Sequence, residues 1–533
     1  MTSTIQVLVF LLAVVAAVAI IANRLKIPPA ILLVTTGIIL ALVPGLPSVE
    51  LAPELVLLLV LPPVIYTSAF LMSWREFKFN LRPITLLAVG SVAFTTLAVA
   101  AAVHWLMHID WAVGFVLGAI VSPPDAIAPL SIARRMEIPR RILVILEGEG
   151  LANDATALIL YRFAVAAVSV GVFSFGQAAG TFAAIAAGEI LWGIGVGWLM
   201  LQLRRWVNDP LIEILLSVLT PFLAFWPPMH LGGSGVLATV TAGLYTSLNG
   251  PRLISPATRL QGIFFWEFFT YVIEGMVFLI TGLQARTVIS RIIDYPLSQL
   301  VISVAVITAV VIAARFVWVF PATYLPRWLF PTIRRKDPSP PWQWPFVLAF
   351  TGVRGIVSLV AALAIPLATA TGHPFPYRDL ILFLTFAVIL ITLVGQGLML
   401  PWLIRELGLF HAGRKEREIN RTEERKARSE AVHAAGERLK QLAAERNLSP
   451  EMVQIIRAQH RDRLKHVDDQ GDDDVTRKHG ELHDEVERAL IVAERTRIND
   501  LFRSGKLKDE ARRRIERELD LREAHLSNQR SEV

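Results

Sequence analysis

The sequence of 533 residues contains no cysteine, and its first 410 residues contain few charges. Without cysteine the chain can form no disulfide, thiolate metal site or cysteine nucleophile. It also has no glycine-rich phosphate-binding loop followed by lysine, which excludes an ATPase of the P-loop type. The 24 basic and 18 acidic residues among the first 410 are too few for a water-soluble globular domain of that size.

The charges that are present are concentrated at the end of the chain. Residues 411–533 contain 28 Lys and Arg and 27 Asp and Glu. The sequence therefore predicts a membrane domain over 1–410 and a cytoplasmic, helical, salt-bridged tail over 411–533. The net charge of +7 does not indicate a nucleic-acid partner, because the excess positive charge lies between apolar segments.

Thirteen segments have the roughly 17–25 mainly apolar residues that a membrane-spanning helix needs. The class predicted is thus an all-α, polytopic membrane protein. The segments are 4–22, 29–45, 52–72, 84–107, 111–132, 142–170, 173–203, 210–226, 232–248, 262–283, 296–320, 345–371 and 379–404.

The loops between these segments differ strongly in positive charge. With the N-terminus outside, the cytoplasmic loops contain 17 Lys and Arg, and the external loops contain only Arg286, Arg291 and Arg378. Basic residues favour the cytoplasmic side. We therefore expect a multi-pass protein of the cell membrane, with the N-terminus outside and the tail inside.

The fifth and twelfth segments contain helix breakers and polar residues. The fifth contains Ser122-Pro-Pro-Asp125-Ala-Ile-Ala-Pro129, and the twelfth contains Gly352-Val-Arg354-Gly-Ile-Val-Ser358. Prolines remove backbone donors and break a regular helix. Broken helices in two halves of a transporter indicate its binding site. The alternative for Asp125 is a capping residue at a proline kink.

The sixth segment contains Glu147-Gly-Glu149-Gly-Leu-Ala-Asn153-Asp154. An ionisable residue at mid-membrane is costly, so Asp154 predicts a functional group. At 100° per residue, Glu147 shares a face with Asp154, whereas Glu149 points elsewhere. Glu149 is therefore the natural partner for Arg354, although Arg354 could instead neutralise the carbonyl ends of the broken helices. Glu274, in the tenth segment, is a further candidate for transport.

Carboxylates and freed carbonyls are hard oxygen ligands that suit a hard cation. Burial of a carboxylate also makes proton binding easier. Asp125 and Asp154 could therefore hold a monovalent cation and a proton in turn, which is sufficient for exchange when access alternates. Asn153 cannot take up a proton, so a single acid of this pair carries it.

These motifs together resemble the electroneutral branch of the sodium/proton exchangers, cation:proton antiporter family 1, over residues 5–405. The elements that carry the resemblance are Leu61-Pro-Pro63, the Ser-Pro-Pro-Asp125 break, Glu149 to Asp154, Ser234 to Ala238, Phe278 to Gly282, and Gly352 to Ser358. The resemblance is to the bacterial type of this family, and it implies a thirteen-span inverted repeat with two broken crossing helices, and a homodimer in a bacterial cell membrane.

The resemblance also implies roles for single residues. Asp154 would bind the ion and carry the proton beside Asp125, and Glu149 and Arg354 would form an ion pair. One sodium would exchange for one proton, in the service of pH and sodium homeostasis, with no cofactor. The sequence departs from the family at Pro124, Gly150 and Thr67, where many members carry oxygen ligands; Ser122 could compensate.

Other functions remain as alternatives. A potassium-preferring antiporter would use the same residues. A passive cation channel fits the broken helices, but the titratable pair predicts coupling. An intramembrane aspartyl protease would use two aspartates, but its second aspartate follows Gly-x-Gly, and here it follows Asn153. We therefore expect a transporter rather than an enzyme.

Overall fold

The computed structural model describes residues 2–44, 56–170, 175–207, 209–292, 295–369, 372–446, 449–456, 458, 474–504, 512, 515–516 and 518–523. These residues are almost entirely helical, and the only β-type pairing among them is an isolated bridge between Ala368 and Pro374. The predicted all-α class is confirmed. The chain divides into two compact units, Met1–Arg414 and Lys415–Val533, and each is described by itself.

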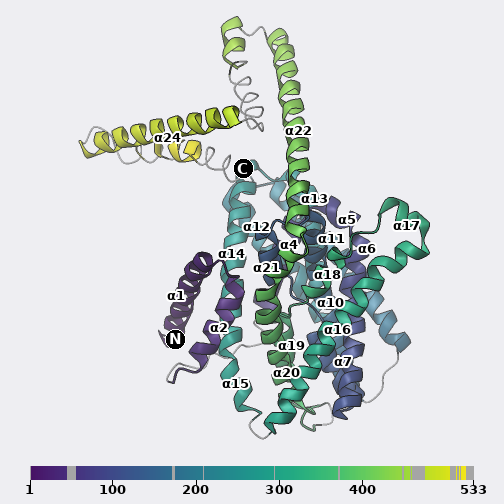
Figure 1. The fold of residues 1–533 in the computed structure, drawn as a ribbon. Helices are drawn as coiled ribbons and strands as arrows, with labels where there is room; N and C mark the ends of the chain where they lie inside the picture. Colours follow the sequence, from purple (N-terminus) through teal and green to yellow (C-terminus); the bar gives the residue numbers. More distant parts are fainter. Residues whose placement is uncertain are drawn as a thin grey trace. The chain divides into compact units, whose positions relative to one another are not determined.

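Helices of the first unit lie at all thirteen predicted segments (Figure 1). Residues 45, 52–55, 173–174, 370 and 371 of those segments lie outside the described residues. The helices are α1 (Thr2–Leu25), α2 (Pro29–Ala41), η1 (Val56–Val60), α4 (Leu61–Leu71), α5 (Trp74–Phe79), α6 (Leu81–Thr85), η2 (Leu86–Ser91), α7 (Val92–Met107), α8 (Trp111–Val121), α9 (Ile127–Arg135), α10 (Arg140–Val170), α11 (Phe175–Arg205), α12 (Pro210–His230), α13 (Val236–Leu253), α14 (Pro256–Leu283), α15 (Ala285–Ser290), α16 (Leu297–Leu329), α17 (Pro331–Lys336), α18 (Gln343–Phe350), α19 (Ile356–Leu363), α20 (Arg378–Ile391), η3 (Thr392–Gln396) and α21 (Gly397–Glu406).

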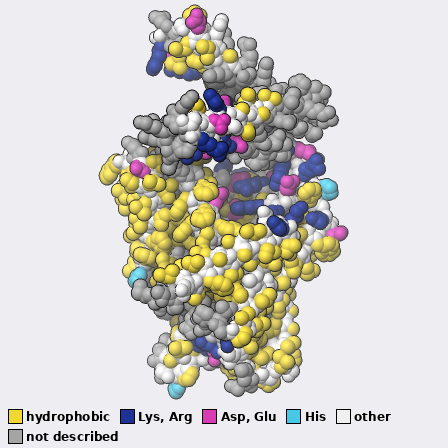
Figure 2. Space-filling model, turned by 90° about the vertical axis from the view of Figure 1, so that its left-hand side faces the viewer, with side chains coloured by type: hydrophobic (Ala, Val, Ile, Leu, Met, Phe, Trp, Pro, Cys, Tyr) yellow, Lys and Arg dark blue, Asp and Glu magenta, His cyan; other side chains and the backbone are white. Residues whose placement is uncertain are grey.

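Eight helical stretches among the described residues are long and apolar enough to cross a membrane, and shorter apolar helices accompany them. The outer surface fits this assignment. Figure 2 shows a face covered by hydrophobic side chains over a continuous area, with Lys and Arg gathered beyond one edge of it. The chain is therefore a multi-pass membrane protein, and the count of thirteen crossings stays a prediction.

The two predicted helix breaks are confirmed. Residues 122–126 separate α8 from α9, and residues 351–355 separate α18 from α19. Proline explains the first break, because Pro123 and Pro124 cannot donate backbone hydrogen bonds there. In the second break, glycine at 352 and 355 leaves room for neighbouring side chains to approach the backbone closely.

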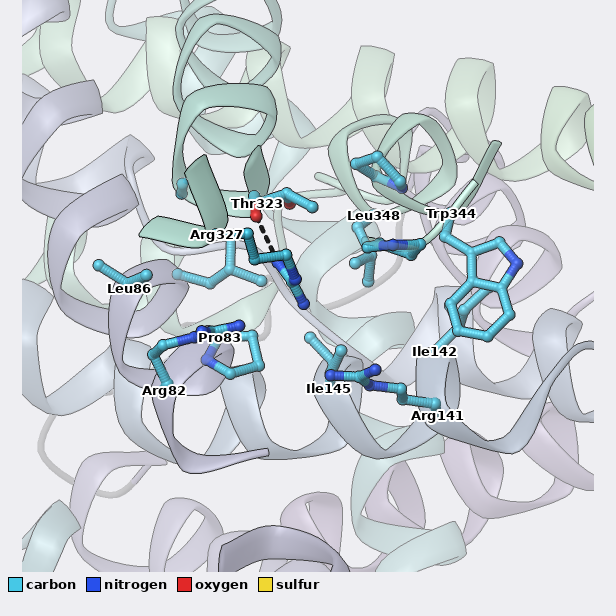
Figure 3. A pocket seen from close by; sticks show the side chains of 14 residues that line it. Arg82, Pro83, Leu86, Arg141, Ile142, Ile145, Thr323, Arg327, Trp344 and Leu348 are labelled. Atoms are coloured by element: carbon cyan, nitrogen blue, oxygen red, sulfur yellow. Dashed lines mark hydrogen bonds between the residues drawn. The ribbon is translucent and has the colours of Figure 1, made fainter. Parts of the chain in front are cut away.

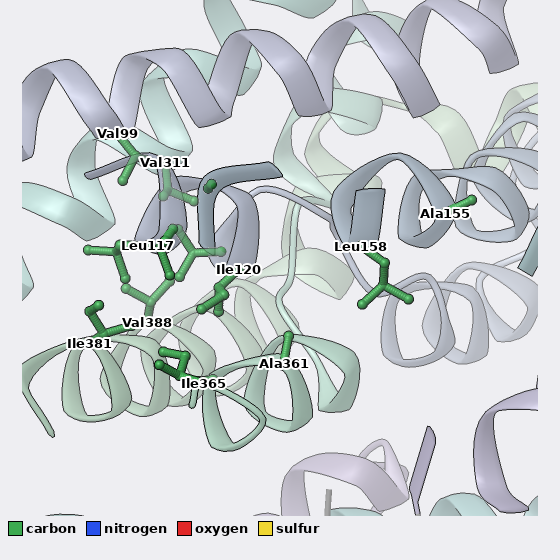
Figure 4. Packing of buried hydrophobic residues seen from close by; sticks show 14 of the residues in the cluster. Val99, Leu117, Ile120, Ala155, Leu158, Val311, Ala361, Ile365, Ile381 and Val388 are labelled. Atoms are coloured by element: carbon green, nitrogen blue, oxygen red, sulfur yellow. The ribbon is translucent and has the colours of Figure 1, made fainter. Parts of the chain in front are cut away.

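Buried hydrophobic side chains pack the helices around these breaks (Figure 4). They come from helices far apart in the sequence, including α7, α8, α10, α16 and α20. Members of this cluster are Val99, Leu117, Ile120, Leu158, Val311, Ile365 and Val388. The packing fixes the position of the breaks, since interiors at close-packed density resist displacement.

The second unit is a set of charged helices. Its largest described elements are most of α22 (Leu409–Glu445) and α24 (Asp474–Arg503). Ile491 of α24 and Leu519 are both buried and pack together. Arg495 forms ion pairs with Asp520 at 2.7 Å and with Glu523 at 2.8 Å. The tail thus contains a small apolar contact flanked by solvated ion pairs.

Candidate functional site

The two broken segments are joined by their main chains. The backbone N–H of Asp125 donates to the carbonyl of Val353 at 2.6 Å. Arg354 closes the same junction from its other side, because its Nε donates to the carbonyl of Val121 at 2.8 Å and Nη2 donates to that of Ser122 at 3.4 Å. The guanidinium also contacts the carbonyl of Gly352. A full positive charge therefore lies against the carbonyl end of α8, where the helix dipole favours a cation.

Asp125 lies in the first break with one oxygen bound and one oxygen free. Its Oδ1 accepts the backbone N–H of Ile127, the first residue of α9, at 2.9 Å. Its Oδ2 is buried and has no hydrogen-bond partner among the described residues. A buried polar atom without a partner is costly and calls for an explanation such as an ion that is not present.

Gly355 makes this placement of Asp125 possible. A β-carbon at position 355 would overlap the carboxylate of Asp125. Gly355 also immediately precedes α19, so the carboxylate lies beside the N-terminus of a second half-helix. Helix N-termini favour negative charge, so α9 and α19 together offset part of the cost of burying the carboxylate of Asp125.

Asn153 and Asp154 approach the first break from α10. The side-chain amide of Asn153 donates to the carbonyl of Pro124 at 2.6 Å, which satisfies a backbone acceptor left free by the break. Its Oδ1 is buried without a partner among the described residues. Asp154 is half-buried, receives no hydrogen bond from the described residues, and interacts electrostatically with Asp125.

The structure thus brings together the predicted site residues Asp125, Asn153 and Asp154. Their side-chain oxygens can coordinate a small cation. Ser122 lies in the same break, but its hydroxyl donates to the carbonyl of Ala119 at 3.2 Å. Its proposed compensation for the missing ligands remains a prediction.

Gly150 lets α10 approach the break closely. A β-carbon at position 150 would lie 2.7 Å from the β-carbon of Ala126, which is closer than side chains normally pack. Gly150 is one of the positions where the sequence departs from the family. The departure therefore has a packing consequence, because Ala126 occupies the space that a larger residue at 150 would need.

The predicted ion pair between Glu149 and Arg354 is wrong. Glu149 pairs instead with Arg315 of α16, through two hydrogen bonds of 2.6 and 2.8 Å. Both side chains are almost fully buried, with 1% and 2% exposed. Arg315 Nε also donates to the carbonyl of Leu348 at the end of α18. Arg354 donates to carbonyls of the breaks, which is the alternative that the sequence left open.

Arg315 is the partner of Glu149 that sequence reasoning missed. It lies within the apolar segment 296–320, among the residues assigned to the eleventh span. The rule that a charge in a spanning segment needs a partner applies to Arg315 as it does to Arg354. Glu149 could thus pair with either Arg315 or Arg354, and the sequence does not say which of these arginines faces α10.

Three other positions singled out in the sequence have identifiable partners. Glu147 pairs with Arg134 at 2.8 Å. Glu274 of α14 interacts electrostatically with Asp125 and with Arg134, which places a third carboxylate toward the breaks. Thr67 donates to the carbonyl of Pro63 at 2.8 Å and accepts from the hydroxyl of Thr270 at 3.1 Å.

Residues 10–406 match the family described as "Sodium/hydrogen exchanger, transmembrane". The chain belongs to this exchanger family. Over 532 residues it is 35% identical to an exchanger of Mycobacterium tuberculosis strain H37Rv whose name is "Uncharacterized Na(+)/H(+) exchanger Rv2287", covering 97% of this chain and 96% of that protein. It is also 35% identical to the "Sodium, potassium, lithium and rubidium/H(+) antiporter" of Bacillus subtilis, covering 74% of this chain and 60% of the relative.

The fold of this exchanger is also found among solved structures. The sodium proton antiporter MjNhaP1 from Methanocaldococcus jannaschii superposes with a TM-score of 0.60 at 18% identity, covering 76% of this chain and 99% of MjNhaP1. The likeness concerns the fold alone. Together with the family match, it confirms the resemblance inferred from the broken-helix motifs and assigns the chain to a transporter family.

Proposed function

We propose that this exchanger transports one monovalent cation in exchange for one proton, with Asp154 and Asp125 as the shared binding site. The observation that carries the proposal is the buried Oδ2 of Asp125, which has no partner among the described residues and lies beside the electrostatically coupled Asp154. Asn153 adds a second buried oxygen without such a partner. These atoms form a set of hard oxygen ligands at the junction of two broken helices.

The surroundings favour Asp154 as the proton carrier. Asp125 accepts a backbone N–H and lies beside the starts of α9 and α19, which stabilise its negative charge. Asp154 has no comparable donor among the described residues. When the cation leaves, its charge must be replaced, because a bare carboxylate in this setting is costly. A proton on Asp154 replaces it, and Asn153 cannot bind a second one.

The remaining charges hold the site in place. Arg354 neutralises the carbonyl end of α8, and the Glu149–Arg315 pair fixes α10 against α16. We assign positioning roles to these three residues, and an accessory role to Glu274 on the route to Asp125. The transported cation and the proton are substrates, and the proposal needs no further cofactor.

The proposal extends to the setting of the protein. The loops rich in Lys and Arg would face the cytoplasm, which puts the N-terminus outside and the tail inside. We propose a homodimer, as the resemblance implies, serving pH and sodium homeostasis. The Bacillus subtilis relative is named for sodium, potassium, lithium and rubidium. We therefore propose sodium as the transported cation, with lithium and potassium as the alternatives to compare.

The test is exchange in proteoliposomes, monitored with a pH-sensitive dye across a range of pH. The native protein should move protons when a gradient of a transported cation is imposed. Asp154→Asn should reduce exchange to the rate of protein-free vesicles, because the site loses its titratable group, while insertion and monodispersity remain native. Glu76→Gln is the matched control, since Glu76 of α5 pairs with Arg140 at the first residue of α10, outside both breaks. Native-like exchange by Asp154→Asn would refute the assignment.

A further inference from the structure

Three arginines from three helices converge on a single carboxylate at the arginine-rich end of the first unit. Arg82 of α6, Arg141 of α10 and Arg327 of α16 contact Asp337 at 2.5, 2.8 and 2.7 Å. Burial alone would raise the pKa of Asp337, but hydrogen bonds and charges from Arg141 and Arg327 outweigh it and lower the pKa below its ordinary value. Asp337 is thus ionised at neutral pH, and the cluster has a net charge of +2.

A cavity of about 30 Å³ opens between these arginines (Figure 3). Its apolar lining comes from residues such as Ile142, Ile145 and Leu348, and Trp344 lies at one side. A space of this size holds about two water-sized groups, which corresponds to two oxygens of a phosphate group and not to the whole group. The side chains of Arg82 and Arg141 are 28% and 22% exposed, so the cavity can be reached from outside.

The arginines differ in how many of their donors are used. Arg327 uses all three of its guanidinium nitrogens, since it donates to the carbonyls of Thr323 and Asp337 and to the carboxylate of Asp337. Arg82 uses only Nη2, and Arg141 uses Nε on Asn80 and Nη2 on Asp337. The other guanidinium nitrogens of these two residues have no hydrogen-bond partner among the described residues, although the Arg141 guanidinium also lies over the Phe79 ring, 5.6 Å from its centroid.

We propose that this cavity is a binding site for a phosphate group, held by Arg82 and Arg141 with Asp337 as an internal competitor. Planar guanidinium groups bind phosphate oxygens with paired, charge-assisted hydrogen bonds. Two unmatched positive charges at a partly buried place favour such an anion over water. The phosphate could belong to a soluble anion or to the headgroup of a membrane phospholipid.

The site would act on the ends of four transmembrane elements. α6, α10 and α16 contribute the arginines, and Trp344 and Leu348 of α18 line the cavity. α10 also contains Asn153 and Asp154. A phosphate bound here would stabilise the packing of these ends, by the linkage that any ligand of the native state exerts. The proposal concerns binding, and it does not depend on the exchange mechanism.

The test measures thermal stability of the purified, delipidated full-length protein in detergent. One arm adds inorganic phosphate against chloride at equal sodium concentration and ionic strength. The other adds phosphatidylglycerol against diacylglycerol, which has the same acyl chains but no phosphate. We expect a rise in melting temperature that saturates in at least one arm, and the responding arm identifies the source of the phosphate. No saturable shift in either arm would overturn the proposal.

Three variants locate the effect. Arg82→Gln should raise the ligand concentration at half-saturation about tenfold, equivalent to about 1.4 kcal/mol. Asp337→Asn should lower that concentration, because the internal competitor is neutralised. Arg335→Gln is the matched control, since Arg335 is exposed on α17 and does not line the cavity. An equal loss in Arg335→Gln and Arg82→Gln would show general surface attraction instead, and unchanged binding in Arg82→Gln would exclude the cavity.

Discussion

Asp125 illustrates how much a single side chain depends on the residue opposite it. Its free oxygen lies against the backbone of Gly355, with no space for a β-carbon between them. The carboxylate can occupy the junction only because position 355 has no side chain. Gly355 is therefore as much a part of the proposed site as the acids themselves, although it supplies no ligand.

Gly355→Ala should severely reduce exchange, because the added methyl group must displace the carboxylate of Asp125 or the start of α19. Dye-monitored exchange in proteoliposomes measures the loss. Gly395→Ala is a suitable control, as a β-carbon at position 395 meets no atom within 4 Å. An alanine at 355 that leaves both rate and cation affinity unchanged would contradict the geometry at the junction.

The Glu149–Arg315 pair makes a separate prediction about stability. Arg315→Leu leaves a buried carboxylate without its partner, which should cost about 3–5 kcal/mol and lower the yield of folded protein. Glu149→Leu combined with Arg315→Leu should recover part of the loss, because replacing both members of a buried pair with apolar groups is often neutral. Thermal unfolding of the single and double variants decides this. Equal melting temperatures for native protein and Arg315→Leu would contradict the pairing.

At the scale of elements, the sequence predicted the helices and the breaks better than the partners. Apolar length and proline position are local properties, so segments 111–132 and 345–371 could be recognised as broken spans. Asp125 and Asp154 could also be singled out, because a charge within an apolar segment stands out, and Asn153 was noted because it adjoins Asp154. The partner of Glu149 was not, since it depends on how α10, α16 and the second break rotate against one another.

The contact between α10 and the first break can be tested by compensation. Gly150→Ala should impair exchange and stability, because its β-carbon would lie 2.7 Å from that of Ala126. Adding Ala126→Gly to the same chain removes the opposing methyl group and should restore both. The two measurements are exchange rate and melting temperature. A double variant as poor as Gly150→Ala alone would show that the helix and the break are held apart by other contacts.

At the scale of the whole molecule, the charge asymmetry of the loops predicts the orientation in the membrane. Because the chain has no cysteine, single cysteines can be introduced without a background signal. Ser290→Cys should react with an impermeant maleimide in right-side-out vesicles. Lys78→Cys should react only after permeabilisation. Both positions are exposed. The reverse pattern would overturn the predicted topology.

The hydrogen bond between the Asp125 amide and the Val353 carbonyl limits how the protein can move ions. It ties the two interrupted helices at their midpoints, and Arg354 ties them again. Neither interrupted helix can shift far alone, so we expect the two helices and a cation bound to Asp125 to move together as one rigid body.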